Sequence, residues 1–291
     1  MSINITSPKV ARELMSSYGI APLKKFGQNF LVDGNIADKI ANAALPQDAG
    51  NAAVIEVGPG LGGLTQRLTT RAAQVAAYEI DAGLVRSLKD TFEGVENFSL
   101  FHQDFLKADL EKELTPIFGE ADIYVAANLP YYITSPCIMK LVESGLNIKR
   151  ITVMIQKEVA QRICAMPGSK EYGSISAAIG FFADAKMLFS VSPSCFYPKP
   201  DVYSAVLSIE MKQYDAEKAE QYSKTVRGLF AKRRKTVRSN LRQSFELTIG
   251  QANAIIQKAQ IDENARAETL NVNDFARISE EIVNIQKNIE N

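Results

Sequence analysis

Short apolar runs alternate with amphipathic stretches over most of this chain. Strands that alternate with helices require crossover connections, which favour a mainly parallel sheet covered by helices. The apolar runs predict seven strands: Ala53–Val57, Gln74–Glu79, Phe98–His102, Ile123–Ala127, Ile151–Gln156, Lys186–Val191 and Ala205–Glu210. Helical patterns lie between most of them: Asp33–Ala44, Leu61–Thr70, Gly83–Phe92, Ser135–Ser144, Glu158–Met166 and Ser174–Ala183. We therefore predict an α/β fold with one seven-stranded sheet.

The connection before the last predicted strand differs from the others. Residues Pro193–Val202 read PSCFYPKPDV, and their prolines predict an extended loop rather than a helical crossover. The last strand is then expected to run antiparallel to its neighbour. After residue 213 the pattern is helical only, with a helix start at Val272 capped by Asn271 or Asn273. We predict two domains: residues 1–213, including an N-terminal extension, and a small all-helical C-terminal domain, residues 214–291.

Composition limits the function classes. The chain has 33 basic and 33 acidic residues, so nucleic-acid binding would need a local basic patch. The single histidine, His102, and three scattered cysteines predict neither a metal site nor a disulfide framework. No apolar run approaches the ~18 residues of a membrane span, and the first residues lack the apolar core of a signal peptide. We expect a cytoplasmic protein that does not bind a membrane.

A glycine-rich turn, Gly58-Pro59-Gly60-Leu61-Gly62-Gly63, follows the first predicted strand. A strand, such a turn and a helix form the cofactor-binding elbow of Rossmann-like sheets, where glycines let a ligand approach the backbone. Glu79 ends the next strand, and its carboxylate can accept hydrogen bonds from both hydroxyls of a ribose. Because the turn also satisfies G-x-G-x-x-G, a nicotinamide-dependent oxidoreductase stays open at this point. Asp104, after the third strand, can accept from an adenine amino group and favours an adenosine ligand.

The fourth predicted strand runs into Asn128-Leu129-Pro130-Tyr131-Tyr132. An aromatic amino group is a weak nucleophile because its lone pair is delocalised into the ring. The Asn128 amide oxygen and the Leu129 carbonyl, presented by the turn at Pro130, can accept hydrogen bonds from such a group and localise its lone pair. Tyr131 can stack on the base. The turn therefore predicts methyl transfer to an amino group, although an ordinary strand-ending turn has the same composition.

These motifs resemble those of the ribosomal RNA adenine N6,N6-dimethyltransferases. The resemblance spans most of the chain in the family's order and is carried by Gly27–Leu31, Glu56–Gly60, Glu79, Asp104, Asn128–Tyr131, Pro193–Ser204 and Lys232–Leu241. It implies a methyltransferase sheet and S-adenosyl-L-methionine as cofactor, with S-adenosyl-L-homocysteine as product and no metal. Asn29 and Leu31 would line the methionine end of the cofactor. Gly58 and Gly60 would lie beneath it, Glu79 would hold its ribose, Asp104 its adenine, and Asn128 would contact both cofactor and target amine. Phe196 would be a second base-stacking aromatic opposite Tyr131.

A basic stretch without acids predicts the surface for RNA. It contains Arg227, Lys232, Arg233, Arg234, Lys235, Arg238 and Arg242. On a continuous helix, Arg234, Arg238 and Arg242 would form a stripe that meets phosphates. The N-terminal extension adds Lys9, Arg12, Lys24 and Lys25. A solvated helix face is the alternative interpretation.

The resemblance implies dimethylation of two adjacent adenines in 16S ribosomal RNA, within the immature 30S subunit, late in assembly. We expect a monomer. One alternative is a large-subunit methyltransferase of the macrolide-resistance type, which shares the catalytic core. Another is an RNA-binding assembly factor in which methylation is secondary or absent.

Overall fold

The computed structural model describes residues 4–21 and 28–290, with side chains as far as residue 287. Gly27, Lys24 and Lys25 lie outside the described residues. Contacts divide the chain into two compact units: Met1–Ala160 with Ala185–Met211, and Gln161–Asp184 with Lys212–Asn291. The second unit thus contains the region predicted as the C-terminal domain and, in addition, the segment Gln161–Asp184.

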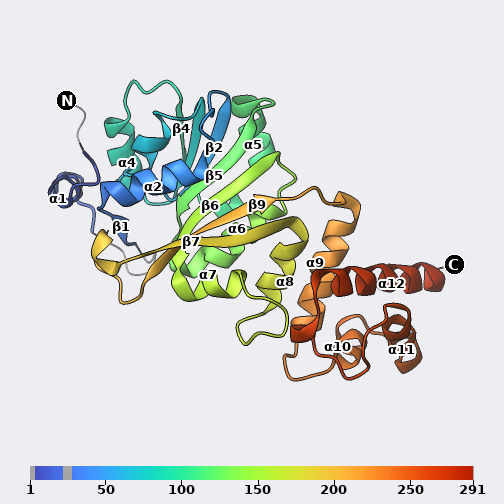
Figure 1. The fold of residues 1–291 in the computed structure, drawn as a ribbon. Coiled ribbons are helices and arrows are strands. Elements are labelled where there is room, and N and C mark those ends of the chain that lie inside the picture. The colour runs from blue at the N-terminus through green and yellow to red at the C-terminus, as the bar shows by residue number, and fades with distance from the viewer. Residues whose placement is uncertain (1–3, 22–27, 291) are drawn as a thin grey trace. The chain divides into compact units, whose positions relative to one another are not determined.

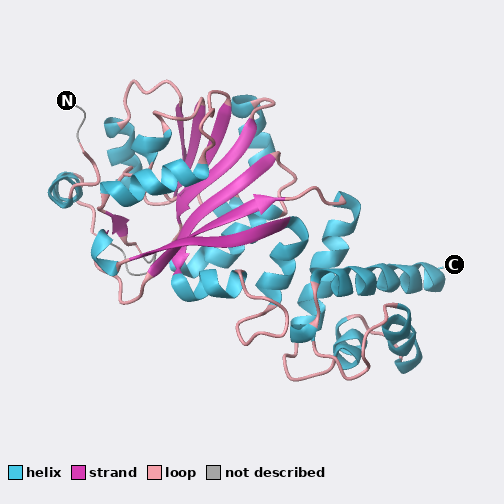
Figure 2. Cartoon of the chain, in the orientation of Figure 1, coloured by secondary structure: helices cyan, strands magenta, loops and turns pink. Residues whose placement is uncertain are grey.

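The first unit is built around a seven-stranded sheet (Figures 1 and 2). Its strand order is β4-β3-β2-β5-β6-β9-β7. The strands are β2 (Ala52–Val57), β3 (Gln74–Glu79), β4 (Phe98–His102), β5 (Asp122–Asn128), β6 (Ile148–Gln156), β7 (Ala183–Val191) and β9 (Ser204–Met211). The pairs from β4 to β6 are parallel, whereas β9 is antiparallel to β6. The predicted fold class and the reversed strand are confirmed.

Helices cover the two faces of the sheet (Figure 1), and this is why the central strands consist mostly of apolar residues. All six residues of β2 are buried. The helices of this region are α1 (Pro8–Ser17), α2 (Gly34–Ala44), α3 (Thr65–Leu68), α4 (Ala82–Thr91), α5 (Leu110–Phe118), α6 (Thr134–Val142) and α7 (Lys157–Ile163). Aspartates begin three of them: the side chains of Asp33, Asp81 and Asp109 accept backbone hydrogen bonds at the starts of α2, α4 and α5.

Three segments differ from the prediction. Helix α3 is much shorter than the predicted Leu61–Thr70, because Gly62 within that segment adopts a positive φ angle of 88°, which a helix does not allow. Helix α5 was not predicted and includes Pro116. Within the predicted extended loop, Phe196–Tyr197 forms a short strand, β8, that pairs antiparallel with β1 (Phe30–Leu31).

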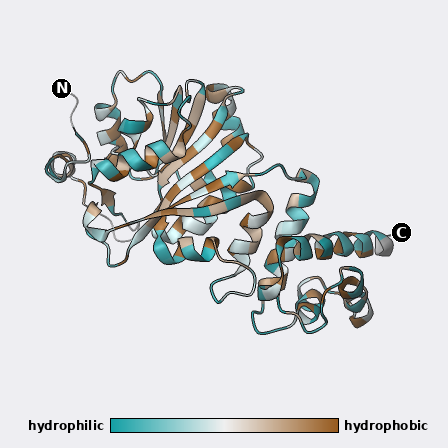
Figure 3. Ribbon diagram, viewed as in Figure 1, coloured by the Kyte–Doolittle hydropathy of each residue, from teal (hydrophilic) through white to brown (hydrophobic). Residues whose placement is uncertain are grey.

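The described part of the second unit is helical apart from the start of β7. Its helices are α8 (Ser174–Phe182), α9 (Ala216–Phe230), α10 (Val237–Ser244), α11 (Ile249–Lys258) and α12 (Val272–Glu290). The Asn271 side chain accepts a hydrogen bond from the Asp274 backbone at 3.0 Å, which confirms the predicted start of α12. Buried Phe275, Ile278 and Ile282 give α12 one apolar face, visible as alternating brown and teal in Figure 3. Among the described helices, none is long and apolar enough to cross a membrane.

Candidate active site

A cleft lies at the edge of the sheet where the parallel strands β2, β3, β4 and β5 end. It encloses about 1040 Å³, including its open mouth. The carboxyl ends of parallel strands share one edge of a sheet, so the turns after these strands all reach the cleft. Ten residues predicted for the cofactor or the chemistry line it: Asn29, Leu31, Gly58, Gly60, Glu79, Asp104, Asn128, Leu129, Pro130 and Tyr131.

The glycine turn forms the floor of the cleft. Gly58 and Gly60 both have left-handed backbone conformations, with φ angles of 67° and 59°. The Gly58 N–H donates a hydrogen bond to the Tyr78 carbonyl at 2.9 Å, which fixes the turn against the neighbouring strand. A Cβ atom at Gly60 would lie 3.1 Å from the Phe30 ring, itself part of the cleft wall. Glycine is therefore required here both by the backbone conformation and by the close approach of Phe30.

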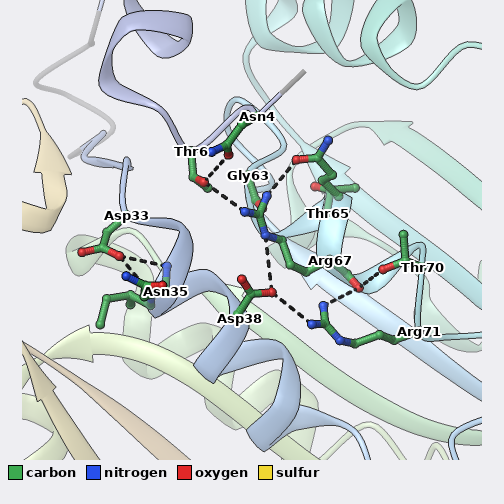
Figure 4. Close-up of polar contacts among 12 residues, drawn as sticks. Asn4, Thr6, Asp33, Asn35, Asp38, Gly63, Thr65, Arg67, Thr70 and Arg71 are labelled. Carbon is green, nitrogen blue, oxygen red and sulfur yellow. Dashed lines mark hydrogen bonds and ion pairs between the residues drawn. The ribbon is translucent and has the colours of Figure 1, made fainter. Parts of the chain in front are cut away.

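The N-terminal segment supports the glycine turn (Figure 4). Thr6 is buried, and a Cβ atom at Gly63 would lie 2.8 Å from its methyl group. The Arg67 guanidinium donates to the Thr6 hydroxyl at 3.1 Å and to the Gly63 carbonyl at 3.3 Å. It also pairs with Asp38 on α2 at 3.7 Å. Arg67 therefore joins the N-terminal segment, the glycine turn and α2 in one network.

Glu79 is held by the backbone of the cleft. One of its carboxylate oxygens accepts from the N–H groups of Ile80 and Asp81, both at 2.9 Å, and the other accepts from Gly60 at 3.3 Å. Burial raises the pKa of Glu79 to about 7, although these three hydrogen bonds lower it. The side chain is thus fixed in orientation before any ligand binds, as recognition of a ribose requires.

A second carboxyl group, Glu56, lies under the same turn. It is buried and accepts a hydrogen bond from the Thr65 hydroxyl at 2.7 Å. Burial, with a smaller contribution from the charge of Glu79, raises its pKa to about 8, although the hydrogen bond from Thr65 lowers it. Glu56 is part of the glycine motif, but the sequence predicts no role for it. Its position near the end of β2, just before the glycine turn, could have indicated that it supports the turn.

Asp104 begins the turn after β4. One oxygen of its carboxylate accepts from the Leu106 N–H at 3.0 Å, and no described residue donates to the other oxygen. This leaves an acceptor at the cleft for a ligand amino group.

Gln103, Tyr132 and Phe30 also line the cleft, and the sequence predicted no role for them. Among the described residues, no three His, Cys, Asp or Glu side chains gather as a metal site would require.

The catalytic turn predicted from the sequence follows β5. The Asn128 amide nitrogen donates to the Asn29 carbonyl at 3.0 Å, while no described donor engages its amide oxygen. The amide is therefore oriented with its acceptor end available. The Pro130 carbonyl accepts hydrogen bonds from the Ile133 N–H and the Thr134 hydroxyl, both at 3.2 Å, which close the turn onto α6.

The two aromatics predicted to hold the base lie in different surroundings. Tyr131 lines the cleft, and its hydroxyl is 2.9 Å from the Ser204 hydroxyl, an interaction that orients the ring. Phe196 does not line the cleft: it is only 4% exposed and packs in the core with Val191 and Val206. Among the described residues, the Phe196 ring makes no ring contact with Tyr131, and its stacking role stays a prediction.

The predicted basic surface is divided between two helices and a loop. Arg227 lies on α9, Arg238 and Arg242 lie on α10, and the remaining four side chains occupy the loop from residue 231 to 236. The expectation of one helical stripe that includes Arg234 is wrong, because Thr236 caps α10 by accepting from Ser239 at 3.3 Å. Six of the seven side chains are exposed, and Arg238 is partly buried. In the N-terminal segment, Lys9 is exposed and lies 3.9 Å from Glu13.

Comparisons with known proteins show the family of this chain. The family model described as ribosomal RNA adenine dimethylase matches residues 23–284. A protein of Bacillus pumilus named ribosomal RNA small subunit methyltransferase A is 42% identical, covering 96% of this chain and 97% of the relative. A protein of the same name from Enterococcus faecalis is 40% identical, covering 94% and 95%.

Two solved structures have the same fold. A dimethyladenosine transferase from Plasmodium falciparum matches with a TM-score of 0.70 and 24% identity, covering 88% of this chain and 96% of that one. The 23S ribosomal RNA methyltransferase ErmE matches with a TM-score of 0.62 and 25% identity, covering 88% and 100%. With a family model that matches nearly its whole length and relatives at about 40% identity, the chain belongs to the ribosomal RNA adenine dimethylase family.

Proposed function

We propose that this enzyme uses S-adenosyl-L-methionine to dimethylate the N6 amino groups of two adjacent adenines in 16S ribosomal RNA, late in assembly of the 30S subunit. The observation that carries the proposal is the orientation of Asn128, whose nitrogen bonds to Asn29 and whose oxygen is available at the cleft. The names of the 39–42% identical relatives support the small subunit as substrate.

The cleft fits the proposed cofactor. Glu79 offers a preoriented carboxylate for the ribose hydroxyls, and Asp104 offers an oxygen without a described donor for the adenine amino group. The floor at Gly58 and Gly60 has no side chain that would exclude a ligand. Asn29 and Leu31 would hold the methionine end. When bound, the cofactor supplies an electrophilic methyl group on its sulfonium, and S-adenosyl-L-homocysteine is the product; no metal takes part.

The residues of the catalytic turn prepare the target amine. The Asn128 amide oxygen and the Leu129 carbonyl accept its two N–H bonds, which localises the nitrogen lone pair for attack. Tyr131 stacks on the base, held by its contact with Ser204. After the first transfer one N–H remains, so a single acceptor still orients the amine for the second transfer. The nitrogen becomes acidic only on methylation, so the attack needs no prior general base.

The second unit supplies the proposed contacts to the RNA backbone. Its exposed basic side chains can neutralise phosphates without reading bases, as expected for recognition of a structured RNA by shape. We propose that the chain acts as a monomer in the cytoplasm on an assembling subunit.

The deciding experiment offers purified, unmodified small and large ribosomal subunits to the enzyme with labelled S-adenosyl-L-methionine. Label in two adjacent adenines of the 16S RNA, located by mass mapping, is the expected result. Label in the 23S RNA alone would instead support the large-subunit alternative, which the likeness to ErmE keeps as the second candidate. Absence of label in both subunits would contradict the catalytic proposal.

A further inference from the structure

Lys140, on α6, is bonded to a turn that belongs to a different part of the sheet. Its ammonium donates to the Leu106 carbonyl at 3.0 Å and to the Ala108 carbonyl at 2.6 Å. Both carbonyls lie in the turn after β4 that begins with Asp104. Hydrogen bonds from a charged donor are roughly twice as strong as those between neutral groups, so this contact is a firm attachment of the turn.

The ammonium also lies beside an aromatic residue of the cleft wall. It is 5.7 Å from the centre of the Phe105 ring, close enough for a cation–π interaction. Phe105 in turn packs edge-on against Tyr78, with ring centres 5.4 Å apart, and both rings line the cleft. Lys140 itself does not line the cleft, so any effect it has on a ligand is exerted through this turn.

Cys137, one turn before Lys140 on α6, is buried and lies within the electrostatic influence of both charged groups. Burial raises the pKa of the Cys137 thiol to about 12, with Asp104 raising it and Lys140 lowering it. The Asp104 carboxylate and the Lys140 ammonium therefore act on the same buried thiol.

The sheet alone does not connect these two turns. In the strand order, β3 and β2 separate β4 from β5, so no backbone ladder links the Asp104 turn to the catalytic turn. Helix α6 begins at Thr134, directly after the catalytic turn, and Lys140 lies six residues further, about 9 Å along the helix. One side chain therefore bridges the two walls of the cleft.

We propose that Lys140 is a positioning residue that sets the Asp104 turn in register with the adenine of the cofactor and ties that turn to the catalytic turn. This inference rests on the proposed cofactor. Without the ammonium, two half-buried carbonyls lose their donor and the turn relaxes. Asp104 then no longer meets the 6-amino group at hydrogen-bond distance, although the residues that hold the ribose and the methionine end are unchanged.

The test compares two ligands by calorimetry: S-adenosyl-L-homocysteine, which carries the 6-amino group, and S-inosyl-L-homocysteine, which carries an oxygen there. Lys140→Met keeps the apolar stem and removes the charge. We expect it to weaken binding of the adenosyl ligand about 10-fold and to leave the inosyl ligand nearly unchanged, so that discrimination between them shrinks. Lys140→Arg, which can still donate to two carbonyls, is expected to restore most of the discrimination.

Lys107→Met is the matched control. Lys107 lies in the same turn, but its side chain is exposed, so its loss should leave both affinities as in wild type. Lys140→Gln, with one neutral donor group, should fall between Met and wild type and serves if the Met variant does not fold. Unchanged discrimination in Lys140→Met and Lys140→Gln, or an equal loss for both ligands, overturns the inference. If wild type binds neither ligand, the cofactor assignment fails instead.

Discussion

The cleft and the basic surface recognise their proposed ligands in opposite ways. In the cleft, hydrogen bonds hold the polar side chains in fixed orientations: Glu79 alone accepts from three backbone N–H groups. On the basic surface, the side chains are mostly exposed, and the ion pairs they form are long, at 3.6 Å for Arg233 with Glu268 and 3.9 Å for Arg238 with Glu263. A small cofactor needs fixed geometry, whereas an RNA backbone needs charge that can adapt.

The two regions should therefore differ in how strongly function depends on a single residue. A preoriented group in the cleft cannot be replaced by its neighbours, because they form other hydrogen bonds. Exposed cations contribute together to phosphate binding, so the others remain when one is lost. Substitutions in the cleft should therefore have large and specific effects, and those on the basic surface small, cumulative and salt-dependent ones.

The largest effect is expected for Asn128→Ala. Removing the amide oxygen takes away one of two proposed acceptors for the target amine and should lower methyl transfer by about 10²- to 10³-fold. RNA binding should stay close to wild type, as filter binding can measure. Equal methyl transfer by the variant and wild type would show that Asn128 has no part in the reaction. If RNA binding fell as much as methyl transfer, the cleft would also contribute to RNA affinity, contrary to the proposed division between cleft and basic surface.

Glu79→Gln should come next. The carboxylate, not the acid, accepts from both ribose hydroxyls, and burial raises the pKa of Glu79 to about 7 in the free protein. Affinity for S-adenosyl-L-homocysteine should therefore increase as the pH rises through 7. At pH 8 the variant should bind S-adenosyl-L-homocysteine about 10-fold more weakly than wild type. Its affinity should also no longer increase as the pH rises through 7. Titration calorimetry of both proteins between pH 6 and pH 8 isolates the contribution of Glu79, and identical profiles would contradict it.

Smaller, additive effects are expected for Arg238→Ala and Arg242→Ala on α10. Each should weaken binding of ribosomal RNA several-fold and reduce the slope of log affinity against log salt by about 0.7–0.9, the signature of one lost phosphate contact. Lys224→Ala is a suitable control, since Lys224 already pairs with Glu220 on α9. A loss of binding by either arginine variant that does not depend on salt would show that this surface is as preorganised as the cleft.

The smallest effect concerns stability. The folded-state pKa of Glu56 is raised to about 8 by burial, from an ordinary value of 4.5. The folded protein thus binds this proton more tightly than the unfolded chain, and the resulting stability is lost as the pH rises through 8. Glu56→Gln can still accept from Thr65 and should raise the Tm at pH 9 by about 3 °C, corresponding to ~1 kcal/mol. At pH 5 the two proteins should melt alike, so a gain at both pH values would point to packing instead.

Local patterns explain which parts of the site could be predicted. Short apolar runs predict the strands, and a parallel sheet brings all their carboxyl ends to one edge. Glu79, Asp104 and Asn128 each stand at or just after the end of such a run, so their common location followed from the sheet alone. The seven strands were predictable from these apolar runs, and the reversed β9 from the proline-rich connection before it.

The sequence by itself thus determined the α/β sheet, the order of its motifs and the turns that meet at the cleft, because these depend on local hydrophobic periodicity. Only the tertiary structure decided contacts between distant segments: Lys140 on the Asp104 turn, Arg67 on Thr6, and Phe196 in the core rather than at the cleft. It also decided where Thr236 ends the basic loop and begins α10. Such contacts depend on how elements pack and on which backbone groups need partners, and neither is encoded in the spacing of residues along the chain.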